Sequence, residues 1–183
     1  MRKVAFFTAL MFVLISSTAA FAGPAPQKVI DLANSQLAAL GTDATVVKAV
    51  NTANSENKTL AQIQELDAQW KADKAAGKTA PYMTELMQND AAKQLNTLMA
   101  QHSFITEIFV TDNQGANVAQ TGGTGDYWQG DEAKFQKVFQ KGILVSDVEQ
   151  EDGKNISQVS IPVLDGQTHI GTMTIGVDVD QVP

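Results

Sequence analysis

The sequence contains no cysteine and almost no arginine. Arg2 is the single arginine among 183 residues, and the formal net charge is −7. A planar guanidinium group is the usual partner of carboxylates and phosphates, and nucleic-acid binding requires a basic surface. These absences argue against a disulfide-stabilised protein, against nucleic acid as a partner, and against bidentate recognition of an acidic ligand.

Patterns that would indicate catalysis or a metal site are also scarce. The two histidines, His102 and His169, are far apart and lack the spacing of metal ligands. Gly125 and Gly130 have the spacing of a phosphate-binding loop, but an acidic pair follows where that loop needs Lys and Ser or Thr. Nothing completes a catalytic site around the carboxylates of residues 126–132. We therefore expect no enzyme activity, no cofactor and no metal, with a calcium site at these carboxylates as the minor alternative.

Residues 1–22 have the pattern of a secretory signal peptide. Arg2 and Lys3 precede an apolar run, and residues 20–22 (AFA) form a cleavage site before Gly23. A retained membrane anchor is the alternative, because the run is close to spanning length. Cleavage would remove two basic groups and no acid, so the net charge would change from −7 to −9. The mature protein is expected to be soluble, and periplasmic or otherwise secreted.

The first half of the chain is predicted to be helical. From Gln27 onward, apolar residues recur at steps of three and four, and Gly41 ends this first helix. Thr42 or Asp43 can cap a second helix with an apolar stripe of its own.

A capping box predicts where the third helix begins. Thr59 and Gln62 have the required spacing, residues 71–80 are small and polar and indicate a loop, and Pro81 suits the first turn of the next helix. The apolar stripes indicate packing in a core rather than a cofactor site. The positions expected to be buried are Leu60, Ile63, Leu66 or Asp67, Trp70, Tyr82, Leu86, Leu95, Leu98 and Met99.

The second half is predicted to be mostly strand. Apolar and polar residues alternate in its last two strands, which indicates an antiparallel sheet with one packed face and one solvated face. Glycine-containing turns separate the strands. The expected strands cover residues 104–111, 116–121, 143–149, 156–164 and 169–182, with a short helix over residues 131–141.

Helices followed by an antiparallel sheet define an α+β layer arrangement. We expect one domain over residues 23–183. Its helical part covers about residues 26–100, and its sheet part covers about residues 103–180.

The stretches IFVTDNQGANVAQT and ISQVSIPVLDGQTHIGTMTIGVDVD, with an acidic and aromatic crossover between them, resemble the extracytoplasmic Cache-type sensor domain, also called PDC and PAS-like. The resemblance covers about residues 60–180. LDAQW and DNQGANVAQ…DYWQGDEAKF look like a single-domain periplasmic subgroup described as PDC-sensor-like. The residues that carry the resemblance are Asp112 with Gly115, Pro162 and Val163 with Gly166, and Gly171.

This resemblance implies a PAS-like, five-stranded antiparallel sheet with long N-terminal helices and a short crossover helix. It also implies a small-molecule ligand between the sheet and the crossover, with a signal passed to a membrane sensor kinase, cyclase or chemoreceptor. The sequence departs from the family pattern twice: no second membrane helix follows the last strand, and no arginine is available to clamp a ligand carboxylate. A homodimer through the N-terminal helices is a further expectation from the resemblance.

The crossover (residues 121–135) is predicted to roof the ligand. Its glycines would let it bend close to the sheet, and two aromatic rings would supply flat walls with polar tips. In the alternative interpretation, Tyr127 and Trp128 complete the core, and Asp131 caps the helix over residues 131–141. The expected ligand-binding residues are Asp126, Tyr127, Trp128, Gln129 and Asp131.

These observations predict an exported, sensor-like module that binds a small molecule beneath the crossover. Two aromatic faces among carboxylates favour an amine or a polar neutral ligand. Lys134 and Lys137 could instead hold an acid, but they are expected to face solvent. The alternative function is a periplasmic adaptor for other proteins, with a filled pocket that binds nothing.

Overall fold

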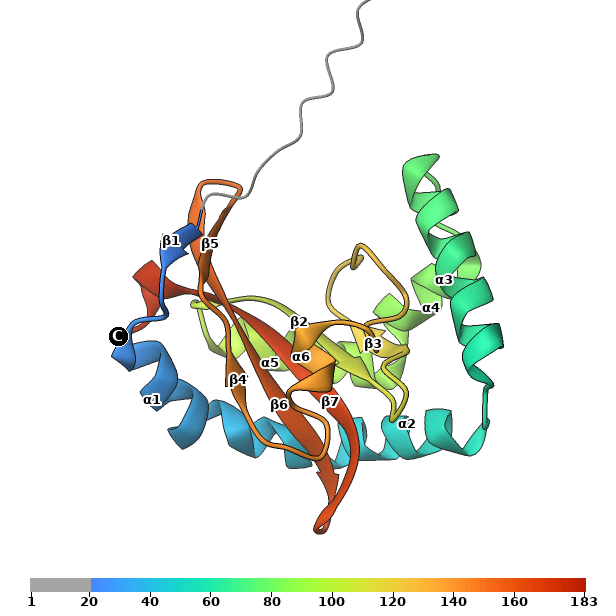
Figure 1. Ribbon diagram of the computed structural model, residues 1–183, viewed down its shortest axis with the longest axis horizontal. Coiled ribbons are helices and arrows are strands. Elements are labelled where there is room, and N and C mark those ends of the chain that lie inside the picture. The colour runs from blue at the N-terminus through green and yellow to red at the C-terminus, as the bar shows by residue number, and fades with distance from the viewer. Residues whose placement is uncertain (1–20) are drawn as a thin grey trace, which may run out of the picture.

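The computed structural model describes residues 21–183 of the chain (Figure 1). Most of the predicted signal peptide, residues 1–20, lies outside the described residues. Strand β1 (Phe21–Gly23) pairs antiparallel with β5 (Val148–Glu151) at one edge of the sheet. The predicted cleavage before Gly23 would therefore divide a paired strand.

The N-terminal helices begin where the sequence offers caps. Helix α1 (Gln27–Ser35) is followed by the 3-10 helix η1 (Leu37–Thr42) and by α2 (Ala44–Ser55). Of the two candidate caps, Asp43 is the one used, because its carboxylate accepts hydrogen bonds of 2.9 and 3.1 Å from N–H groups in the first turn of α2. These elements run along one side of the sheet in Figure 1.

Helix α3 (Leu60–Ala75) opens on the predicted capping box of Thr59 and Gln62. It runs further than predicted, so the first half of the loop expected over residues 71–80 is helical instead. Lysine and alanine favour a helix, and the chain turns away only at Gly77, where φ is +67°. Leu60 is 46% exposed, so the expectation that it is buried was wrong.

The helix predicted after Pro81 is divided into α4 (Pro81–Gln88) and α5 (Asp90–Gln101). Asn89 lies between them and caps α5, because its side-chain oxygen accepts the N–H of Ala92 at 2.8 Å. Its amide nitrogen donates to the carbonyl of Val118 at 2.9 Å. One side chain therefore ends α4, starts α5 and joins both to the sheet.

Seven antiparallel strands form the sheet, six of them in the order β1-β5-β6-β7-β2-β3, and the seventh, β4, pairs with β6. The predicted α+β fold with an antiparallel sheet is confirmed. The sheet has two strands more than the five expected, because β1 adds an edge strand and the strand predicted over residues 143–149 is divided into β4 and β5. The remaining strands are β2 (Ile105–Thr111), β3 (Asn117–Gln120), β4 (Leu144–Val145), β6 (Lys154–Asp165) and β7 (Thr168–Asp178).

One face of the sheet packs against α1, η1, α2 and α5 and forms the main core. The alternating apolar residues of β6 and β7 lie on this face, as the sequence predicted. They are fully buried, and they are Val159, Ile161, Val163, Met173, Ile175 and Val177.

The opposite face was expected to be solvated, and that expectation was wrong. Thr172 and Thr174 are only 2% and 1% exposed. Their hydroxyls are paired across strands, Thr172 with Thr111 at 2.8 Å and Thr174 with Ser160 at 2.9 Å. The crossover and the short helix α6 (Ala133–Gln136) cover this face, and Figure 1 shows α6 in front of the sheet and α5 behind it.

A second, smaller hydrophobic cluster joins α3 and α4 to the crossover. Its buried members are separate from the main core, so the crossover has a packing partner of its own. They are Ile63, Trp70, Met83, Ala116 and Tyr127.

Candidate functional site

Helix α3 holds the crossover through a buried carboxylate. Asp67 accepts hydrogen bonds on one oxygen from the backbone N–H groups of Tyr127 (3.0 Å) and Trp128 (3.1 Å). Its other oxygen accepts a 2.7 Å bond from the ammonium of Lys71. The sequence left open whether residue 66 or 67 faces inward, and Asp67 does so because it has these donors to satisfy.

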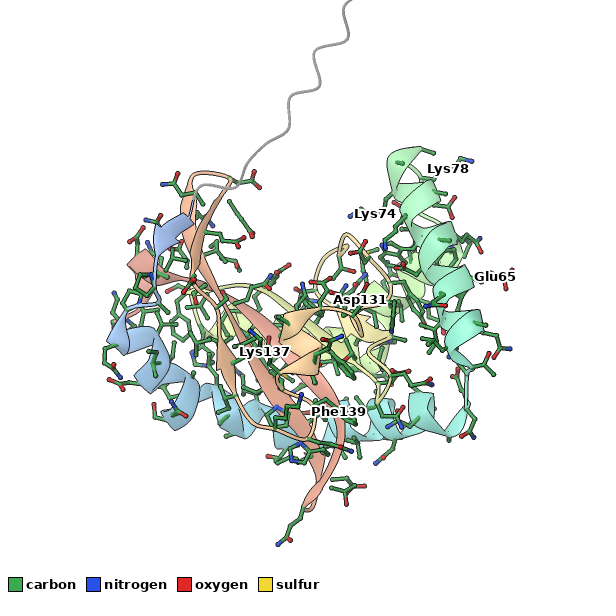
Figure 2. All side chains as sticks on the ribbon, viewed as in Figure 1. Glu65, Lys74, Lys78, Asp131, Lys137 and Phe139 are labelled. Carbon is green, nitrogen blue, oxygen red and sulfur yellow. The ribbon has the colours of Figure 1, made fainter. Side chains whose placement is uncertain are left out.

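Two further side chains of α3 contact the same segment. The indole nitrogen of Trp70 donates to the carbonyl of Thr124 at 3.0 Å. The ammonium of Lys74 donates to the carbonyls of Gly123 and Thr124 at 2.9 and 3.0 Å. Figure 2 shows Lys74 on the side of α3 that faces the crossover and Glu65 on the opposite side. A movement of the crossover would therefore be transmitted directly to α3 through these hydrogen bonds.

On its other side, the crossover pairs with the turn between β2 and β3. The N–H of Asn117 donates to the carbonyl of Tyr127 at 2.9 Å, and the N–H of Gln129 donates to the carbonyl of Gly115 at 2.7 Å. Gly115 has a φ of +85°, and a Cβ at this position would overlap Gly130. Only glycine fits there, because the backbone is left-handed and the crossover lies directly against it.

The two aromatic residues of the crossover face α3 and α4 rather than the sheet. Tyr127 is 7% exposed, and its ring centroid lies 6.2 Å from that of Trp70. Burial raises the pKa of Tyr127 to about 12. Trp128 packs on the same cluster and donates its indole N–H to the carbonyl of Gln114 at 2.8 Å. Both rings complete a core, as the alternative interpretation predicted.

Asp131 does not join the other predicted site residues. It is exposed, and it lines none of the three cavities described below. Nor does it cap the following helix: α6 begins after Glu132, which itself makes no side-chain capping bond. The capping interpretation was therefore wrong, because the helix starts two residues later and is shorter than predicted.

Asp126 and Gln129 do come together, at a cavity of about 190 Å³ between the crossover and the second face of the sheet. We call it the inner cavity. Gln129 is 2% exposed, and its amide nitrogen donates to the carbonyl of Asp126 at 2.9 Å. Its amide oxygen is buried and has no hydrogen-bond partner within residues 21–183. The lining residues are Glu107, Phe109, Thr124, Gly125, Asp126, Gln129, Glu132, Lys134 and Gln158.

The inner cavity is predominantly acidic. Glu107 is one of three carboxylates in its wall, and burial together with the charge of Glu151 raises the pKa of Glu107. Lys134 and a 3.3 Å hydrogen bond from the amide of Gln158 act in the opposite direction. A donor-rich or cationic ligand would therefore be favoured here over an anion.

Lys134 is the one lysine in this wall. Its ammonium lies 3.0 Å from a carboxylate oxygen of Glu132 and 5.2 Å from the ring centroid of Phe109. Its side chain is 20% exposed, so the expectation that it faces solvent was wrong, because Glu132 and Phe109 draw it over the sheet. Lys137 is exposed, as predicted.

The structure has two further hollows, one beside the inner cavity and one on the helical side. An outer cavity of about 340 Å³ shares Glu132, Lys134 and Gln158 with the inner cavity and adds two more carboxylates, Glu149 and Glu151. A wide groove of about 790 Å³ lies on the helical side, between α2 and the α4–α5 junction. Its walls carry charges of both signs, and Tyr127 is the predicted site residue that it contains.

Within residues 21–183 no group of three or more His, Asp or Glu side chains is placed to hold a metal ion. In the same part of the chain, no helix combines the length and the apolar character that crossing a membrane requires.

Sequence reasoning missed the wall that the sheet contributes. Glu107 and Phe109 of β2 and Gln158 of β6 lie on the face that was expected to be solvated. The sequence did contain an indication of this wall. Glu107 and Gln158 are polar residues next to the core residues Ile108 and Val159, so they must lie on the opposite face of the sheet. This indication was not recognised, because polar residues on alternate positions also occur on an ordinary solvated face.

Neither a family model nor a curated protein matches the sequence. Solved structures that resemble the chain are sensor domains of histidine kinases and chemoreceptors, the Cache/PDC-type class that the sequence resembles. The sensor domain of the V. cholerae histidine kinase DctB is 13% identical, with a TM-score of 0.48. The match covers 85% of this chain and 52% of that one.

The sensor domain of E. coli DcuS is 16% identical, with a TM-score of 0.39 and coverage of 76% of this chain and 96% of that one. The sensory domain of the Campylobacter jejuni chemoreceptor Tlp3 with isoleucine bound is 14% identical, with a TM-score of 0.39 and coverage of 86% and 66%. The chain spans about half the length of the histidine-kinase domains that it matches.

Proposed function

We propose that the protein is an exported, sensor-like module that binds a small amine or polar neutral molecule in the inner cavity and passes its bound state to a membrane partner. The observation that carries this proposal is an acidic cavity beneath the crossover, one of whose lining residues, Gln129, has a buried amide oxygen without a hydrogen-bond partner within residues 21–183. A buried acceptor without a donor destabilises the folded protein. A ligand N–H group that reached this oxygen would remove that penalty. An ammonium group would also gain from the carboxylates of Asp126 and Glu107.

The size of the cavity limits the ligand. Its volume of about 190 Å³ is below the range of roughly 300–1,000 Å³ that is usual for pockets of drug-sized molecules. The ligand should therefore have only a few non-hydrogen atoms, unless a wall residue moves. An open cavity supports the sensor role over the adaptor role, which requires a filled pocket.

The contacts of the crossover offer a route for the signal. A ligand at Asp126 and Gln129 touches the segment that Asp67 and Trp70 hold against α3. A shift of the crossover would have to carry these hydrogen bonds with it or break them. Helix α3 would then present the bound state to a partner, and its outward side, on which Glu65 lies, is the surface available for contact (Figure 2).

Calorimetry on refolded, ligand-stripped protein tests the proposal with matched ligand pairs. We expect propylammonium to bind and propionate not to bind. Gln129→Leu removes the acceptor and should weaken propylammonium binding by about tenfold, and Asp126→Asn should weaken it similarly. Asp31→Asn is the control, because it removes the same charge from an exposed position on α1.

Two outcomes would count against the proposal. Tight binding of propionate that survives Asp126→Asn would reverse the assigned ligand charge. Failure of a broad panel of small amines and neutral metabolites to bind or to raise the melting temperature would favour the adaptor instead.

A further inference from the structure

The ammonium of Lys134 lies close to an aromatic ring and a carboxylate at the inner cavity. Its ammonium lies over the Phe109 ring at 5.2 Å and pairs with Glu132 at 3.0 Å. An aromatic face and a carboxylate are the two groups that best hold an organic cation. Glu107 and Asp126 line the same cavity, and the carboxylate of Asp126 also lies 3.4 Å from the ammonium of Lys71.

Lys134 also stands at the boundary between two hollows. It lines both the inner cavity of about 190 Å³ and the outer cavity of about 340 Å³, together with Glu132 and Gln158. Withdrawal of this side chain would join the two hollows into one acidic cleft. The long, flexible stem of a lysine makes such a movement inexpensive relative to a backbone change.

We propose that the surface formed by Phe109, Glu132 and Glu107 is an ammonium-binding subsite, and that Lys134 fills it as a tethered substitute until a ligand ammonium displaces it. The inference rests on the proposed function and deepens it, since it names the atoms that receive the cation. Gln129 lines the same cavity, and its buried amide oxygen has no hydrogen-bond partner within residues 21–183.

Displacement has a consequence for affinity. An external cation competes with an ammonium that is always present at high effective concentration, so the free protein binds amines more weakly than the empty subsite would. Removal of the Lys134 charge should therefore tighten amine binding, whereas removal of a lysine that holds an acidic ligand would weaken binding. The two possible roles of Lys134 thus predict opposite changes in ligand affinity when its charge is removed.

The test compares Lys134→Gln with Lys137→Gln, which removes the same charge from an exposed position on the same segment. Propylammonium chloride is titrated into each protein by calorimetry at constant ionic strength, after thermal melts show that the variants are folded. We expect Lys134→Gln to bind propylammonium at least about fivefold more tightly than wild type, and Lys137→Gln to change affinity by less than about twofold. Phe109→Leu, which keeps an apolar side chain, should weaken binding.

A second readout does not depend on affinity. Reductive methylation followed by peptide mass spectrometry should label Lys134 more slowly than Lys137 in wild-type protein. Propylammonium is itself a primary amine and consumes the reagent, so the labelling of Lys134 is expressed relative to that of Lys137 in the same sample. Saturating propylammonium, or the substitution Glu132→Gln, should raise this ratio. These rates report whether the ammonium leaves its position.

The outcomes separate the two proposals. The tethered substitute is refuted, while the binding function stands, if wild type binds propylammonium but Lys134→Gln binds no more tightly. It is refuted in the same way if the ligand lowers the labelling of Lys134 relative to that of Lys137. If only Lys134→Gln binds, the substitute is supported in its strongest form. If no protein binds propylammonium, the subsite and the amine-binding function both fail.

Discussion

Asp67 provides the sharpest test of how the crossover is held. Its side chain is 10% exposed, and one oxygen accepts two backbone N–H groups of the crossover at 3.0 and 3.1 Å. Alanine at this position would remove both acceptors and leave the buried N–H of Tyr127 without a partner. Hydrogen bonds to a charged group contribute about 1.5–3 kcal/mol each, and water can replace part of the bond at the half-buried Trp128 N–H, so we expect a loss of about 3 kcal/mol.

Asn at position 67 should behave differently from Ala. Its amide oxygen can still accept both N–H groups, so the expected loss is only about 1 kcal/mol. The ion pair with Lys71 adds little to either value, because the lysine side chain is 51% exposed. In a domain of this size about 3 kcal/mol corresponds to a decrease in melting temperature of about 6–12 °C.

Thermal unfolding followed by circular dichroism measures these differences. Glu65→Ala is the control, because Glu65 is exposed on the outward side of the same helix, so the melting temperature should change little. If Asp67→Ala has the same melting temperature as Asp67→Asn or as the control, the two backbone hydrogen bonds do not hold the crossover and the reasoning is wrong.

Three further predictions concern the turn, the aromatic cluster and the cavity. Gly115→Ala should destabilise the fold by about 2 kcal/mol or more, measured by urea unfolding, because alanine meets both a left-handed backbone and the adjacent crossover. Trp70→Phe retains the ring packing but loses the N–H donor, so its cost should be about 1 kcal/mol and clearly below that of Trp70→Ala. The raised pKa of Glu107, caused by burial and by Glu151 and opposed by Lys134, means that the native state keeps this proton to a higher pH than the unfolded chain. Its contribution to the free energy of unfolding is therefore greatest below its ordinary pKa of 4.5 and decreases as the pH rises through the raised value. Glu107→Gln should remove that decrease, and an unchanged difference from wild type between about pH 4 and pH 7 would contradict the assignment.

The helices and strands could be predicted largely from local signals. The capping box at Thr59, the Asp43 cap and the alternation in β6 and β7 each depend on residues close together in the chain, and each is present in the structure. The first half of the loop expected over residues 71–80 is helical instead, because its small and polar residues are also good helix formers. Composition alone does not distinguish these two outcomes.

The site was harder to predict because three distant segments build it. Asp126 and Gln129 were found from the crossover alone, whereas Glu107 and Gln158 reach the cavity only through the pairing of β2 and β6 with β7. Tyr127 was expected to face a ligand above the sheet, and it packs against α3 and α4 instead of lining the inner cavity, because the sequence does not indicate on which side of the crossover α3 lies. The ligand-binding roles of all these residues stay predictions.

The position of β7 in the sheet has a consequence for how the chain acquires its fold. β7 is the last strand in sequence, yet it lies between β6 and β2, and Ile105 pairs with Val177 across almost the whole second half of the chain. Such non-local pairing slows folding, because a long loop must close before any contact stabilises it. A nascent chain without β7 has two unpaired strand edges, and such edges favour aggregation. The sheet should therefore form late and cooperatively, only after β7 has been synthesised and can pair with both β6 and β2.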